Sequence, residues 1–81
     1  MSDARLDQVR TAFNTAFGTA PEAVTNDSTP DDIEGWDSLG HVRLASELEG
    51  IFDLSFDVDD LMKMEDVAAI LDVLQTKLGA A

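Results

Sequence analysis

The sequence contains one histidine, His41, which follows Ser38 by three residues. Side chains three residues apart are neighbours on a helix, so the two could form the nucleophile and base of an acyl-transfer site. Residues 35–40 read GWDSLG, however, with one residue too many before the serine for a Gly-x-Ser-x-Gly nucleophile elbow. A surface histidine on an acidic helix is therefore the simpler interpretation of His41.

A short acidic segment raises the question of a calcium site. Acidic and hydroxyl side chains alternate along it, at Asp53, Ser55, Asp57 and Asp59. An EF-hand loop needs glycine at its sixth position and glutamate at its twelfth, where this chain has Val58 and Met64. The chain has no cysteine for a thiolate zinc site either. We therefore expect a solvated acidic edge and no metal.

The charge of the chain is strongly one-sided. Its 81 residues carry 17 acidic and 5 basic side chains, a net charge of −12. Such a charge repels nucleic acid and anionic lipid, so we expect neither as a partner. No apolar stretch approaches the ~20 residues of a membrane span. We therefore expect one soluble, cytoplasmic, monomeric domain over residues 1–81.

Apolar residues spaced by three and four predict the main elements of the fold. They indicate helices over residues 3–17, 38–52 and 65–78. Residues 54–58 alternate like a strand but have no partner strand. They are therefore expected to form an extended connector that places Leu54 and Phe56 in the core. A short helix should follow near residues 57–62. Met62 and Met64 could form an adaptable hydrophobic surface, but filling of the core is the simpler interpretation. The predicted fold class is all-α, a small four-helix bundle of three main helices and one short one.

The segment between the first two helices has no periodicity. Residues 19–37 contain prolines, glycine and an Asn-Asp-Ser cluster, which predict a long loop. Residues 29–32, TPDD, suit a single helical turn. Trp36 either fastens this loop to the bundle or forms an exposed contact. Ser38, at the start of the next helix, suits an N-cap. Because loops of this length are commonly functional, the loop and the helix start are the candidate site.

The tripeptide Asp37-Ser38-Leu39, which opens an acidic helix after a long loop, resembles the acyl carrier protein family. The similarity continues in one register through Val42, Leu44, Leu48, Glu49, Phe52, Asp53, Phe56, Leu61, Lys63, Met64 and Val67. It implies a non-catalytic carrier in which a phosphopantetheinyl transferase attaches 4'-phosphopantetheine from coenzyme A to Ser38. Asp37 would help to place the magnesium ion of that enzyme. The arm would carry acyl groups as thioesters, which fits a chain without a thiol of its own.

The resemblance also implies partners and a place for the cargo. The partners would be acyl-activating, acyltransferase or ketosynthase-type enzymes whose basic patches meet the acidic second helix. The residues that we expect at this contact are Asp37, Leu39, Val42, Arg43, Glu47 and Glu49. The positions that match the family's acyl-chain pocket are Val42, Leu48, Phe56, Leu61, Met64 and Val67. Ordinary core packing is the alternative interpretation of these six.

Two departures from the family pattern bear on the pathway. Carriers of fatty-acid synthesis usually have acids where this chain has Gly40 and Arg43, and the Gly-Gly-x-Ser pattern of peptidyl carriers is absent. We therefore favour a stand-alone carrier for polyketide-like or other specialised biosynthesis. The alternatives are a carrier of fatty-acid synthesis and an aminoacyl or D-alanyl carrier. An acidic helical protein-interaction module without a prosthetic group, in which Ser38 is only a cap, is the alternative of another class.

Overall fold

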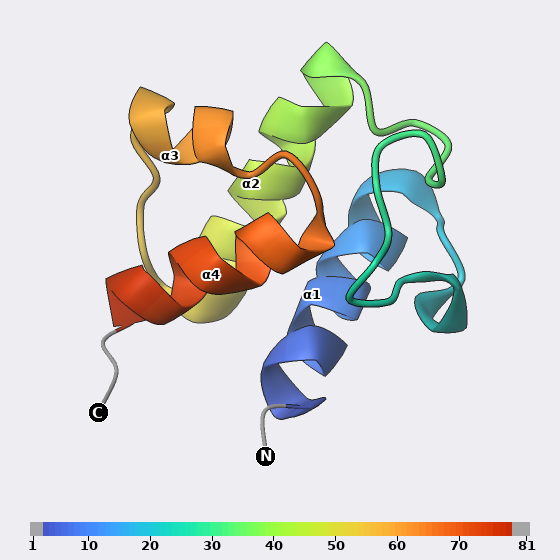
Figure 1. The fold of residues 1–81 in the computed structure, drawn as a ribbon, viewed down its shortest axis with the longest axis horizontal. Helices are drawn as coiled ribbons and strands as arrows, with labels where there is room; N and C mark the ends of the chain where they lie inside the picture. Colours follow the sequence, from blue (N-terminus) through green and yellow to red (C-terminus); the bar gives the residue numbers. More distant parts are fainter. Residues whose placement is uncertain (1–2, 79–81) are drawn as a thin grey trace.

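Helices make up the regular structure of the computed structural model, which describes residues 3–78 (Figure 1). In chain order they are α1 (Asp3–Phe17), the 3₁₀ helix η1 (Pro21–Ala23), α2 (Ser38–Phe52), α3 (Val58–Lys63) and α4 (Val67–Leu78). No strand occurs in the described part of the chain, so the predicted all-α bundle of three main helices and one short helix is confirmed. None of the helices in this part is long and apolar enough to cross a membrane.

The helix boundaries depend on local caps. The predicted bounds of α1 and α2 are those of the structure, and α3 is shifted by one residue. Helix α4 begins at Val67, two residues later than predicted, because the Asp66 carboxylate accepts a hydrogen bond of 2.8 Å from the backbone N–H of Ala69. At the start of α3, Asp57 and Asp60 each accept a hydrogen bond from the other's backbone N–H, which forms a capping box.

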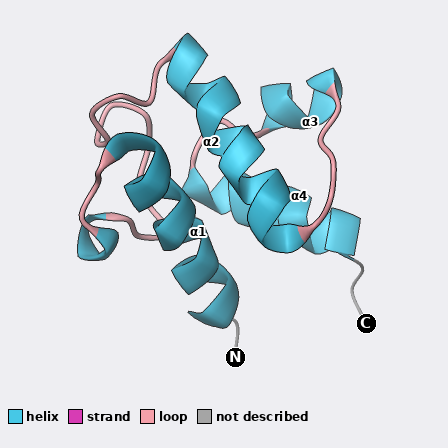
Figure 2. Cartoon of the chain, turned by 180° about the vertical axis from the view of Figure 1, so that it is seen from behind, coloured by secondary structure: helices cyan, strands magenta, loops and turns pink. Residues whose placement is uncertain are grey.

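One hydrophobic core joins the three long helices. Its fully buried side chains include Val9, Ala12 and Phe13 of α1, Leu44 and Leu48 of α2, and Val67, Ile70 and Leu74 of α4. Leu54 and Phe56 of the connector are partly buried against this core, as predicted. Helix α3 lies on the side of the bundle away from α1, which is clear when the molecule is seen from behind (Figure 2). The core therefore holds α1, α2 and α4 together and leaves α3 beside α2 and α4.

The long loop is tied to the bundle at several points. Arg10 of α1 donates a hydrogen bond of 2.8 Å to the Val24 carbonyl, and the backbone N–H of Val67 donates one of 3.0 Å to the Ser28 carbonyl. The loop also contributes Val24, Ile33 and Trp36 to the core. Because its backbone and side chains are both held, the loop forms a fixed platform that leads into α2.

The single turn predicted in the loop is present as one hydrogen-bonded turn that is not part of a helix. The N–H of Asp32 does donate to the Thr29 carbonyl, at 2.9 Å, but no helix continues from this turn. Thr29 is not a cap, because its own N–H and hydroxyl donate to the Asp32 carboxylate at 3.0 and 3.2 Å. The 3₁₀ helix η1 was not predicted, although Pro21 at its first position is a known signal for a helix start.

Candidate functional site

The N-terminus of α2 has an exposed serine whose side chain does not cap the helix. Asp37 is the N-cap, because its Oδ1 accepts a hydrogen bond of 2.8 Å from the backbone N–H of Gly40. Ser38 is the first residue of the helix, it is exposed, and its hydroxyl makes no hydrogen bond within residues 3–78. The predicted N-cap role of Ser38 is therefore wrong. Its hydroxyl lies instead at the positive end of a 15-residue helix, available for chemistry.

His41 connects three parts of the molecule. Its Nδ1 lies 2.8 Å from the indole Nε1 of Trp36, and its Nε2 lies 2.9 Å from the Leu61 carbonyl oxygen. An indole N–H can only donate, so Nδ1 accepts and the ring hydrogen is on Nε2, which donates to Leu61. The side chain is half-buried, so the predicted surface histidine is wrong. With both nitrogens engaged, neither is left to act as a base for Ser38, which argues against a hydrolase.

The indole of Trp36 is part of the hydrophobic core and does not lie on the surface. Its side chain is buried and packs edge-on against Phe13, with ring centroids 5.0 Å apart, and its ring lies beside that of His41 in a nearly parallel plane, with centroids 6.1 Å apart. Of the two interpretations of Trp36, the structure therefore supports the one in which it fastens the loop to the bundle.

A groove of about 580 Å³ lies beside Ser38, between the start of α2 and the segment around α3. Ser38, Val42 and Met62 lie at its exposed rim. Trp36, His41 and Met64, which are more buried, also line it. Met62 is 71% exposed, so its predicted place in the core is wrong, whereas Met64 is buried as predicted. The groove is largely apolar and starts at the serine, which suits a chain attached there.

The six predicted acyl-pocket residues separate into two groups. Val42, Leu61 and Met64 line the groove. Leu48 and Val67 are fully buried in the core, and Phe56 is partly buried against it. The structure also adds lining residues that sequence reasoning missed, Pro30, Trp36 and Met62. Only the position of Trp36 next to Asp37-Ser38 hinted at its presence.

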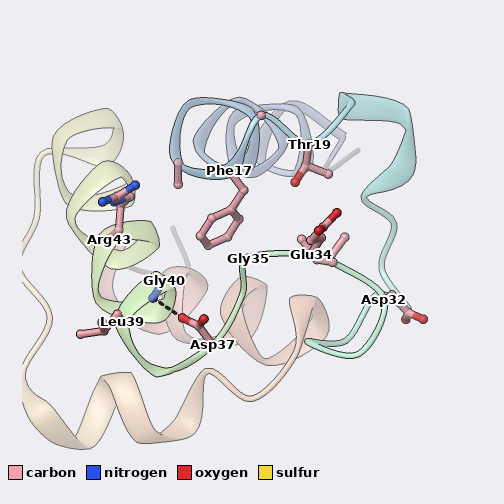
Figure 3. A pocket seen from close by; sticks show the side chains of 12 residues that line it. Phe17, Thr19, Asp32, Glu34, Gly35, Asp37, Leu39, Gly40 and Arg43 are labelled. Carbon is pink, nitrogen blue, oxygen red and sulfur yellow. Dashed lines mark hydrogen bonds between the residues drawn. The ribbon is translucent and has the colours of Figure 1, made fainter.

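A second hollow, of about 660 Å³, lies on the side of the α2 N-terminus that faces the end of α1 (Figure 3). Phe17, Gly35, Gly40 and Arg43 are among its lining residues. A Cβ atom added to Gly40 would overlap the carbonyl oxygen of Gly35 and would lie 2.9 Å from Cε1 of Phe17. The glycine at position 40 therefore has a packing reason.

The six residues predicted to meet partners differ in exposure. Leu39 and Val42 are 85% and 58% exposed, and Asp37 and Arg43 are exposed as well. Glu47 and Glu49 are half-buried. Glu49 also has a structural contact, because its Oε2 accepts a hydrogen bond of 2.8 Å from the backbone N–H of Phe56. The exposed members of this set are thus two apolar residues, one acid and one base, with the two glutamates less accessible.

One ion pair joins α3 to α4. Lys77 Nζ lies 2.8 Å from Oδ2 of Asp60, and this hydrogen bond lowers the pKa of the Asp60 carboxyl and raises that of the Lys77 ammonium. Two acids of the alternating segment stand at helix ends. Asp57 is the N-cap of α3, and Asp53 is the C-cap of α2 in the left-handed conformation. Across residues 3–78, no three His, Asp or Glu side chains are grouped so that they could hold a metal ion.

Comparison with known proteins connects this geometry to a chemistry. Residues 7–74 match the family model described as "Phosphopantetheine attachment site". The chain is 36% identical over 64 residues to the non-reducing polyketide synthase pks11 of Talaromyces marneffei, and 35% identical over 72 residues to the non-reducing polyketide synthase pigA of Monascus ruber. These matches cover 79% and 89% of the chain but only 2% and 3% of the two synthases.

A solved structure has the same architecture over nearly the whole chain. The solution structure of the holo acyl carrier protein from Geobacter metallireducens superposes with a TM-score of 0.78 at 30% sequence identity. The match covers 90% of this chain and 84% of the other. The chain therefore has the fold of this holo acyl carrier protein.

Proposed function

Because the chain belongs to the phosphopantetheine attachment-site family of acyl carrier proteins, we propose that Ser38 is the attachment residue and that its cargo is an acyl intermediate of polyketide-like biosynthesis. The observation that supports Ser38 as the attachment residue is that capping and exposure fall on different residues at the start of α2. Asp37 caps the helix, which leaves the exposed hydroxyl of Ser38 without a structural partner in the described residues.

The residues present fit 4'-phosphopantetheine. The first-turn N–H groups and the dipole of α2 favour a phosphodiester at Ser38. During modification the Ser38 oxygen forms a bond to the β-phosphorus of coenzyme A, the pyrophosphate bond breaks, and adenosine 3',5'-bisphosphate leaves. The hydroxyl proton goes to a base of the transferase. Asp37 uses only Oδ1 for capping, so its second oxygen is available to the magnesium ion of that enzyme. Once bound, the group supplies the thiol that a cysteine-free chain lacks, and with it the capacity to carry acyl groups as thioesters.

The chain acts as a carrier and a substrate of other enzymes, and not as a catalyst. His41 holds the Trp36 loop and the Leu61 carbonyl and has no free nitrogen for proton transfer. The chemistry on the cargo therefore belongs to partner enzymes, which meet the surface around Ser38. Leu39 and Val42 would supply apolar contact, and the carboxylates would meet basic side chains. Such charge pairs mainly speed encounter and select partners.

The relatives and one cation support the proposed pathway. Both curated relatives named above are non-reducing polyketide synthases, which favours polyketide-like cargo. Arg43 is exposed on α2, one turn and a half after Ser38, within the predicted contact surface. A cation there opposes docking to a basic patch built for carboxylates. Gly40 carries less weight for the pathway, since the close approach of Gly35 already explains it.

Intact-mass measurement tests the attachment residue. We expect the wild type, incubated with coenzyme A and a broad-specificity phosphopantetheinyl transferase, to gain the mass of one phosphopantetheinyl group. The Ser38→Ala variant should gain nothing. Ser46→Ala, which removes an exposed serine from the same helix, is the matched control and should be modified like the wild type. No gain on the wild type, or a gain on Ser38→Ala, would disprove the assignment.

A further inference from the structure

The aromatic rings of Trp36 and His41 lie where the groove beside Ser38 meets the hydrophobic core. The two rings lie edge to edge in nearly parallel planes, with an interplanar angle of 20° and the indole N–H directed at His41 Nδ1. Both line the groove, whereas the fully buried Leu44, Leu48 and Ile70 do not. A chain that starts at Ser38 therefore meets these rings before it reaches the core.

A polar bridge holds the two rings in place. The indole N–H donates to His41 Nδ1 at 2.8 Å, and the opposite ring nitrogen, 2.9 Å from the Leu61 carbonyl, donates to it. The bridge connects the loop, α2 and α3. Its three groups are the Trp36 indole, the His41 imidazole and the Leu61 carbonyl, and we call them together the latch. Phe13, which packs against the indole, anchors the latch in the core.

The latch opposes the entry of an aliphatic chain between α2 and α3. Such a chain could pass only by separating the three groups of the latch. It offers no donor or acceptor in return, so the indole N–H and the imidazole would lose their partners, and the Leu61 carbonyl would keep only the backbone N–H of Met64, at 3.3 Å. Leaving buried polar groups unpaired is unfavourable, and the intact latch therefore favours a position of the chain outside the core.

We propose that the latch is a specificity-determining device that holds the cargo of Ser38 in the groove and out of the helical core. This inference rests on the proposed attachment at Ser38. The cargo lies between Val42 and Met62, where partner enzymes can reach it. The groove combines these apolar side chains with Glu65 and Asp37 at its edge. It therefore suits short acyl groups and chains that carry hydroxyl groups, and it does not shelter long saturated chains.

The test uses alkyl chains attached without any enzyme. A Ser38→Cys variant has one thiol, because the chain contains no other cysteine, and it forms disulfides with butyl, octyl and dodecyl methanethiosulfonates. The measurements are the melting temperature and the methyl NMR signals of Leu48 and Ile70. With the latch intact, we expect the melting temperature not to rise with chain length and these core signals not to move.

Opening the latch should reverse this result. In the Ser38→Cys background, His41→Ala should make the melting temperature rise with chain length and should shift the core methyl signals. Trp36→Phe keeps an aromatic ring but loses the N–H, and should give a smaller rise, which provides a second variant if His41→Ala does not fold. Arg43→Ala, on the same helix but outside the groove, is the control. In the Ser38→Cys background it should behave like the Ser38→Cys protein with the intact latch.

The outcomes separate this inference from the proposed function. Stabilisation by dodecyl and movement of the core signals with the latch intact would overturn the latch, whatever coenzyme A does at Ser38. Equal behaviour of His41→Ala, Trp36→Phe and the intact latch would overturn it as well. Absence of phosphopantetheinylation of the wild type would instead overturn the assignment of Ser38, and leaves the alkyl experiment unaffected.

Discussion

Substitution of Gly40 by alanine tests the packing of the long loop on α2. A Cβ atom at this position would overlap the Gly35 carbonyl oxygen and would also crowd the ring of Phe17, 2.9 Å away (Figure 3). The phenylalanine ring is able to rotate away. The carbonyl belongs to the loop backbone, however, and can retreat only if the turn that carries the buried Trp36 moves.

The expected magnitude follows from two opposing effects. Alanine in place of glycine in a helix gains up to about 1 kcal/mol in helix propensity, and less in the first turn. Overpacking typically costs about 1–3 kcal/mol. Because the overlap involves backbone, we expect the cost to dominate and Gly40→Ala to lower the free energy of unfolding by ~1–2 kcal/mol. For a domain of this size, each kcal/mol corresponds to a change of about 4–8 °C in melting temperature.

Gly50 provides the matched control. It lies in the same helix, is exposed, and a Cβ atom there would meet no atom within 4 Å. Gly50→Ala should therefore stabilise the protein by ~0.5–1 kcal/mol through helix propensity alone. The same chemical change in one helix is thus expected to give effects of opposite sign.

Thermal and urea denaturation, followed by far-ultraviolet circular dichroism, measure both variants. Fluorescence adds an independent readout, because Trp36 is the only tryptophan of the chain. Movement of the loop in Gly40→Ala should expose the indole and shift its emission to longer wavelength, and Gly50→Ala should leave it unchanged. If Gly40→Ala stabilised the protein as much as Gly50→Ala with unchanged emission, the loop would not approach α2 as described.

Three further predictions concern the site and its surroundings. Asp37→Ala should lower the free energy of unfolding by about 1 kcal/mol through loss of the N-cap, whereas Ser38→Ala should change it by no more than ~0.5 kcal/mol, both measured by urea denaturation. Lys77→Ala should lower the melting temperature at neutral pH, because the ion pair lowers the pKa of Asp60. The stabilisation is present above the ordinary carboxyl value of 3.8 and is lost as the pH falls below it. Arg43→Glu should increase the rate of acyl loading by fatty-acid-synthase partners, measured by mass spectrometry of the holo form.

Each of these three predictions has a control or a result that would contradict it. A loss of stability in Ser38→Ala equal to that in Asp37→Ala would return the capping role to the serine. Removal of Lys63, which is exposed and forms no ion pair in the described residues, should have a smaller effect than Lys77→Ala, and a Lys77 effect that persists in acid would contradict the ion pair. Lys63→Glu makes the same change of charge as the Arg43 variant, so equal rates for these two variants would remove Arg43 from the specificity argument.

The long helices could be predicted from the sequence because their signals are local. Two full turns or more of apolar spacing, with Gly18 after α1 and Asp37 before α2, define both helices. Helix α3 has six residues, less than two turns, so its periodicity does not define a buried face. For this reason the sequence placed Met62 in the core, whereas it is exposed at the groove.

The candidate site was only partly predictable. Ser38 was identified through the family resemblance, since Asp37 and Ser38 are both good capping residues and the sequence does not decide between them. The contact of His41 with Trp36 and Leu61 depends on how the loop and α3 fold back onto α2. A contact 20 residues apart along the chain leaves no periodic signal. An indole donor five residues before an imidazole was the only hint.

The anchored loop has a consequence for the enzymes that must find Ser38. Fixing one residue of a flexible backbone loses about 1–2 kcal/mol of conformational entropy. In this protein that loss occurs during folding, because Arg10 and Val67 hold the loop through backbone carbonyls and Trp36 holds it through the core. A transferase that binds the start of α2 therefore meets a preorganised surface and does not have to order it. Because no binding free energy is needed to order the loop, more of it contributes to recognition of the surface. A partner can therefore bind selectively even when the contact is brief.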